Sequence, residues 1–70
     1  GEPAAAVAPL EEATRRDPDQ PYPWAQLGNA YLAADRVTDA AAAFRTALRV
    51  RPGYQPAADG LAAVDRRLAQ

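Results

Sequence analysis

The sequence predicts an all-α fold of antiparallel helical hairpins. Trp24, Leu27 and Tyr31 recur at i, i+3 and i+7, so they share one face of a helix. Phe44 centres a second apolar stripe, because alanines stand four residues before it and three residues after it. Pro52 has no backbone N–H and cannot continue the second helix. Two such stripes, separated by a short turn and closed by a proline, are typical of a helical hairpin.

The composition argues against catalysis. Seventy residues form one small domain at most. The chain has no Cys and no His, which excludes disulfides and thiolate metal sites and removes the commonest neutral-pH acid/base group. It has no Ser or Lys either, and its threonines have no neighbouring base. A net charge of −1 argues against a general nucleic-acid binder. We therefore expect no enzyme activity, no cofactor, no metal and no nucleic-acid partner.

Membrane and targeting signals are not expected within these residues. No apolar run approaches the roughly 20 residues that span a bilayer, and no basic segment followed by an apolar one marks a signal peptide. This pattern is compatible with a cytoplasmic or a periplasmic location. All eight basic residues are Arg, and Ala is the commonest residue, which indicates a GC-rich bacterial coding sequence.

The first helix is expected from about residue 9 to 17. Pro9 suits a first helical turn, and Glu11 and Glu12 suit the positive end of a helix. A helix that began earlier would place Pro9 in its interior, where it costs about 3 kcal/mol and kinks the helix. Residues 3–8 are therefore expected to be partly helical or frayed.

The next two helices are expected at about 22–34 and 38–51. Prolines just before the first of them can occupy its first turn, where the N–H has no intrahelical partner. Asp35 is expected to end that helix in a left-handed conformation, which Asp tolerates. Thr38 is the expected N-cap of the following helix, with Asp39 in its first turn.

The last helix is expected at about 56–69, after a turn that contains Gly53. Leu61, Val64 and Leu68 stand at i, i+3 and i+7 and give it one narrow apolar face.

The hairpin resembles a tetratricopeptide (TPR) repeat, whose pattern is W-x₂-L-G-x₂-Y…A-x₃-F…P. The residues that carry the resemblance are Trp24, Leu27, Gly28, Tyr31, Ala40, Phe44, Ala47 and Pro52. A shift of about 34 residues, the period of that family, places Pro18 on Pro52 and Leu10 on Phe44. The alternative is any other helical hairpin with alanine-rich faces.

The resemblance implies a right-handed superhelical stack over the whole chain. Residues 21–54 would form one complete repeat, and 1–20 would be the second helix of a preceding half repeat. Residues 55–70 would form a terminal or capping helix, or the first half of a truncated repeat, since Asp65 stands where the repeat has Tyr31. The expected core is Leu10, Ala13, Trp24, Leu27, Gly28, Tyr31, Ala40, Phe44, Ala47, Leu48, Leu61, Val64 and Leu68.

The resemblance also implies a protein–protein interaction scaffold. In that family the first helix of each repeat lines a groove that holds a peptide or a partner helix. The corresponding residues here are Tyr22, Ala25, Asn29, Leu32 and Ala33, joined on the last helix by Asp59, Ala63, Arg66 and Arg67. Asn29 offers a donor and an acceptor. Arg66 and Arg67 could bind a carboxylate or simply complement the helix dipole. A family-type carboxylate clamp is not expected, because Ala25 replaces its Lys.

Charge is uneven along the chain and leaves other functions open. Residues 1–35 carry six acids against two arginines, whereas residues 36–70 carry six arginines against three acids. This polarity could steer pairing of identical chains, or it could reflect ordinary solvated faces. Homo-oligomerisation by stacking of the terminal half repeats is therefore one alternative function. A regulatory segment of a longer multidomain protein is the other.

Overall fold

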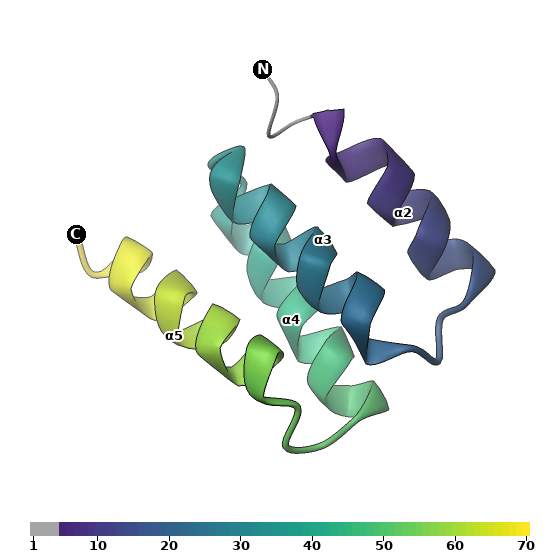
Figure 1. Cartoon of the computed structure of the whole chain (residues 1–70). Helices are drawn as coiled ribbons and strands as arrows, with labels where there is room; N and C mark the ends of the chain where they lie inside the picture. The colour runs from purple at the N-terminus through teal and green to yellow at the C-terminus, as the bar shows by residue number, and fades with distance from the viewer. Residues whose placement is uncertain (1–4) are drawn as a thin grey trace.

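The structure is a computed structural model that describes residues 5–70, and within that range it is all helical with no strand. Helices α2 (Val7–Arg16), α3 (Pro21–Ala33), α4 (Val37–Val50) and α5 (Gln55–Leu68) follow one another in antiparallel hairpins. Figure 1 shows α3 between α2 and α5, with α4 lying against α3 and α5. The Cα atoms occupy a slab of 34 × 29 × 14 Å, so much of each helix borders solvent.

The start of α2 differs from the prediction, because the helix begins at Val7 and not near Pro9. Pro9 is the third helical residue, and the first helical bond runs from the Leu10 N–H to the Ala6 carbonyl at 3.3 Å. Since the N–H groups of the first turn have no intrahelical partner, Pro9 removes no bond there. The earlier start therefore avoids the cost that the prediction assigned to a helix beginning before Pro9. Residues 3 and 4 of the predicted frayed segment lie outside the described range.

The turn between α3 and α4 confirms the prediction for Asp35, which adopts φ +64°. The Asp35 N–H donates to the Leu32 carbonyl at 3.0 Å and the Arg36 N–H donates to the Tyr31 carbonyl at 2.7 Å. These two bonds form a Schellman motif, which satisfies the last carbonyls of α3.

The predicted N-cap of α4 is wrong. Arg36 precedes the helix, and its side chain does not cap it. Thr38 is the second helical residue, because the Schellman turn delivers the chain directly into α4 at Val37. Asp39 does lie in the first turn, where a carboxylate complements the helix dipole.

Phe44 is the centre of the core and is fully buried. A Cβ built on Gly28 of α3 would lie 2.6 Å from the ring, and one built on Gly60 of α5 would lie 2.2 Å from it. The ring therefore packs directly on the backbones of two neighbouring helices, which only glycine permits at these distances.

The repeat period of about 34 residues makes Ala62 the counterpart of Gly28 on α5, but Ala62 is exposed and Gly60 makes the contact with Phe44. The reason is geometric. Gly28 belongs to α3, the hairpin partner of α4, whereas α5 contacts both α3 and α4 and meets the same Phe44 ring beside α3. Two residues correspond to about 200° around a helix, so a different face of α5 meets Phe44.

The predicted core is confirmed in its centre and corrected at its edges. The predicted residues that are buried are Leu27, Gly28, Tyr31, Ala40, Phe44, Ala47 and Val64. Those that are half-buried are Leu10, Ala13, Trp24, Leu48 and Leu61. The prediction for Leu68 is wrong, since this residue is 67% exposed at the end of α5. The buried residues that the prediction missed are Val7, Thr14, Ala25, Ala30, Ala41, Ala43, Ala57 and Gly60.

Candidate partner-binding site

The outer face of α3 carries three of the predicted site residues. Tyr22, Asn29 and Ala33 are exposed and stand at i, i+7 and i+11, so they form one stripe. Tyr22 is 62% exposed, which is unusual for a large aromatic side chain. The stripe is about 16 Å long at about 1.5 Å per helical residue. It could hold roughly five residues of extended peptide at about 3.3 Å each.

Ala25 and Leu32 do not belong to this stripe. Ala25 is 1% exposed, and half-buried Leu32 packs against the core. Ala25 and Leu32 are seven residues apart, so they lie on the same side of α3, which the adjoining helices cover. Ala25 is therefore a packing residue and does not line the stripe, contrary to the prediction. Leu32 exposes only part of its side chain to solvent.

Gln26 is a member of the stripe that sequence reasoning missed. It stands four residues after Tyr22 and three before Asn29, and it is half-buried at the edge of the exposed face. Helical spacing alone could have identified it. With Asn29, it gives the stripe two side-chain amides, each a donor and an acceptor.

The two arginines predicted on α5 have different environments. Arg67 Nη1 pairs with Asp35 Oδ1 at 3.0 Å and links the end of α5 to the turn that follows α3. Both side chains are substantially exposed, so this bridge contributes about 1 kcal/mol at most. Arg66 is exposed and forms no ion pair within residues 5–70. Of these two arginines, Arg66 is therefore the one whose charge is free to meet a partner.

The other two residues predicted on α5 offer less to a partner. Asp59 is exposed and accepts a hydrogen bond from Gln55 Nε2 at 2.7 Å. Ala63 is half-buried.

Behind the stripe, Tyr31 fixes α3 to its neighbours. Its hydroxyl donates to Glu11 Oε2 of α2 at 2.6 Å, and the Arg36 guanidinium lies 4.5 Å from the centre of its ring. Burial and the bond to the Glu11 carboxylate raise the pKa of Tyr31 to about 12. The phenol is therefore protonated at neutral pH and serves as a donor that ties α2 to α3.

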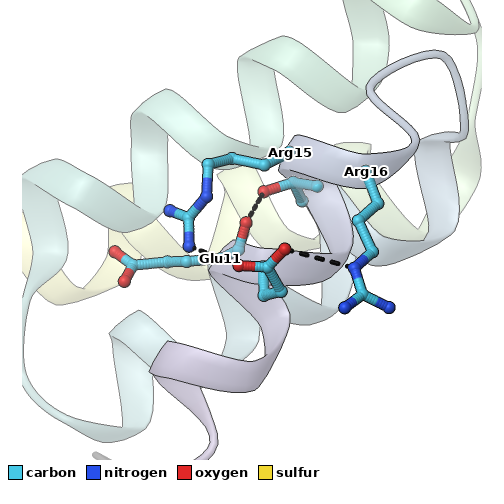
Figure 2. Close-up of polar contacts among 5 residues, drawn as sticks. Glu11, Arg15 and Arg16 are labelled. Carbon is cyan, nitrogen blue, oxygen red and sulfur yellow. Dashed lines mark hydrogen bonds and ion pairs between the residues drawn. The ribbon is translucent and has the colours of Figure 1, made fainter.

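The outer face of α2 carries a local ion cluster (Figure 2). Arg15 Nη2 lies 2.8 Å and Arg16 Nε 3.2 Å from the Glu12 carboxylate, while the Glu11 carboxylate points away from Arg16. Hydrogen bonds from Arg15 and then Arg16 lower the pKa of Glu12, and the same pairing raises the pKa of Arg15. These groups satisfy one another on an exposed surface, so they offer little to a partner.

A second surface feature, which was not predicted from the sequence, lies beside Trp24. It is an open depression of about 700 Å³, lined by Pro18, Asp19, Trp24, Thr46, Arg49 and Val50. Trp24 Nε1 donates to the Pro18 carbonyl at 3.0 Å, which holds the ring against the turn between α2 and α3. No spacing rule places that turn beside α4, so the sequence gives no sign of the depression.

Two other kinds of feature do not occur in the described part of the chain. No cluster of three or more potential metal ligands occurs within residues 5–70. No helix in that range is both long and apolar enough to cross a membrane.

Comparison with known proteins places this architecture in a family. No curated protein and no solved structure matches the chain. A family model described as tetratricopeptide repeat matches residues 1–64, which is most of the chain. The match spans the hairpin of α3 and α4, the preceding α2 and most of α5. The chain therefore belongs to the tetratricopeptide repeat family.

Proposed function

We propose that the outer face of α3, together with the exposed end of α5, binds an extended peptide or a partner helix. Tetratricopeptide repeats generally mediate protein–protein interaction and are typically non-catalytic. The observation that carries the proposal is the exposed stripe of Tyr22, Asn29 and Ala33, on a helix that packs closely against Phe44 through Gly28.

The chemistry of the stripe favours a particular kind of partner. Tyr22 offers an aromatic face at the start of α3, where an apolar side chain could pack. Asn29 can exchange hydrogen bonds with a peptide backbone in the middle. Arg66 supplies a cation for a carboxylate near the other end. The expected ligand is a short segment with an apolar residue at one end and an acidic residue at the other.

Photo-crosslinking tests whether a partner contacts this face. Tyr22 is replaced with the photoreactive residue p-benzoylphenylalanine, and Arg45 on the outer face of α4 is replaced in the same way as a control. Irradiation in the source cell should join a partner to the chain labelled at position 22 and not to the chain labelled at position 45. Equal capture at both positions, or capture at 45 alone, would contradict the proposal.

Affinity measurements with the captured segment test the residues. A synthetic peptide of that segment is titrated into wild type, Asn29→Ala, Arg66→Ala and the control Arg45→Ala. Loss of one hydrogen bond of about 1 kcal/mol corresponds to an affinity about fivefold lower for each of the first two variants. An unchanged affinity in both would exclude Asn29 and Arg66 from the site.

A further inference from the structure

The depression beside Trp24 has opposite charges on its two walls. Asp19 belongs to the turn between α2 and α3, whereas Arg49 belongs to the last turn of α4. Both side chains are exposed. The ion pairs within residues 5–70 use other carboxylates and other arginines, so neither Asp19 nor Arg49 has an ionic partner there. Two unneutralised charges of opposite sign therefore border one hollow.

The floor of the depression offers apolar surface and no spare donor. The Trp24 N–H is bonded to the Pro18 carbonyl, and the Thr46 hydroxyl donates to the Ala42 carbonyl at 2.9 Å. The rest of the floor consists of the half-buried indole ring of Trp24 and the side chains of Pro18 and Val50. Such a floor suits the methylene groups of a long side chain, and an indole ring also attracts a guanidinium.

The arrangement favours a second copy of the chain over other occupants. An acidic partner would meet the like charge of Asp19, and a basic partner would meet that of Arg49. A partner that satisfies both walls must carry the same two charges in reverse order. A copy related by a two-fold axis through the depression does so, because each Asp19 then faces the Arg49 of the other copy.

We propose that this depression is the contact surface of a two-fold homodimer. The Arg49 side chain of each copy enters the hollow of the other, lies on the Trp24 ring and pairs with Asp19. The hollow, at about 700 Å³, has room for the incoming side chain. This surface lies apart from the stripe of α3 and does not involve the end-to-end stacking of half repeats.

Charge reversal tests the dimer without disturbing the fold, since Asp19 and Arg49 are both exposed. The chain and three variants, Asp19→Arg, Arg49→Asp and the control Arg66→Asp, are compared by sedimentation equilibrium from micromolar to millimolar concentration. Wild type and control should dimerise equally. Each reversal creates two repulsive contacts in place of two attractive ones, and it should weaken association by about tenfold or more. Trp24 is the one tryptophan of the chain, so its fluorescence should change with concentration in the dimerising proteins only.

Mixing the two reversed variants gives the decisive result. In an equimolar mixture each Arg at position 19 can face an Asp at position 49, so the heterodimer should recover the wild-type affinity. A wild-type chain that stays monomeric at millimolar concentration overturns the proposal. So does a dimer that neither reversal weakens, or a mixture that remains as weak as its components. A dimer lost in Leu68→Asp but kept in both reversals would assign association to the end of α5 and would equally overturn it.

Discussion

Replacing Gly60 with Ala tests the packing around Phe44. The added Cβ would lie 2.2 Å from ring atom Cε1, whereas ordinary contact begins near 3.4 Å. The ring or the helix must therefore move by about 1 Å, the difference between these distances. The ring cannot simply retreat, because on α3 it already lies so close to Gly28 that a Cβ there would stand 2.6 Å away.

The expected magnitude follows from two opposing effects. Overpacking of a confined core site costs about 3 kcal/mol, at the upper end of the usual range. Replacing a helical Gly with Ala returns about 1 kcal/mol of helix propensity. The net loss in the free energy of unfolding should be about 2 kcal/mol. For a domain of this size, that corresponds to a melting temperature lower by roughly 10 °C.

Thermal and urea unfolding followed by circular dichroism measures this loss. Ala62→Gly is the matched control, because Ala62 is exposed on the same helix and reports propensity alone, with an expected loss of about 1 kcal/mol. Adding Phe44→Leu to Gly60→Ala should make the combined loss at least about 1 kcal/mol smaller than the sum of the single losses. If Gly60→Ala raises the melting temperature, the ring is not confined between α3 and α5 and the reasoning fails.

Three further variants should have distinct outcomes. Phe44→Ala should lower the free energy of unfolding by about 3–5 kcal/mol, so circular dichroism should show an unfolded domain. A melting curve like that of wild type would show that the Phe44 ring does not stabilise the core. Tyr31 has a folded pKa of about 12, above its unfolded value near 10, so its stabilising contribution is complete below pH 10 and is lost as the pH rises through 12. Tyr31→Phe should therefore flatten that alkaline decline in urea titrations, and an equally steep decline would assign it to another group. Asp35→Gly should change stability by less than about 1 kcal/mol, since relief of the left-handed conformation offsets the lost bridge to Arg67. A larger loss on urea unfolding would mean that this bridge is worth more than a surface pair.

The helices and the centre of the core were predictable because their signals are local and periodic. Trp24, Leu27 and Tyr31 identify the inner face of α3 by spacing alone, and Asp35 marks its end by a conformation that few residues tolerate. Phe44 and the alanines on either side of it identify the apolar stripe of α4 in the same way. Each of these inferences requires only residues within one helix or turn.

The errors arose where one helix meets a second neighbour. Gly60 could not be identified from the repeat spacing, because its role depends on the side from which α5 approaches α4. Helical spacing likewise predicts Ala25 as a lining residue, whereas the adjoining helices bury it. Thr38 has the chemistry of an N-cap, but the tight turn at Asp35 starts α4 one residue before it.

The candidate site was predictable only in outline. The stripe of Tyr22, Asn29 and Ala33 follows from helical periodicity together with the family resemblance. The division of roles between Arg66 and Arg67 does not, because it depends on a bridge between residues 32 positions apart. The depression at Trp24 brings a turn and two helices together, and such a surface exists only after the chain has folded.

The central claim is that a partner lies along the outer face of α3. Titration of the captured peptide into isotope-labelled chain, followed by NMR amide shifts, tests it most directly. We predict that the largest shifts fall on Tyr22, Asn29, Ala33 and Arg66. Shifts concentrated instead on the outer face of α4, around Arg45, would contradict the account.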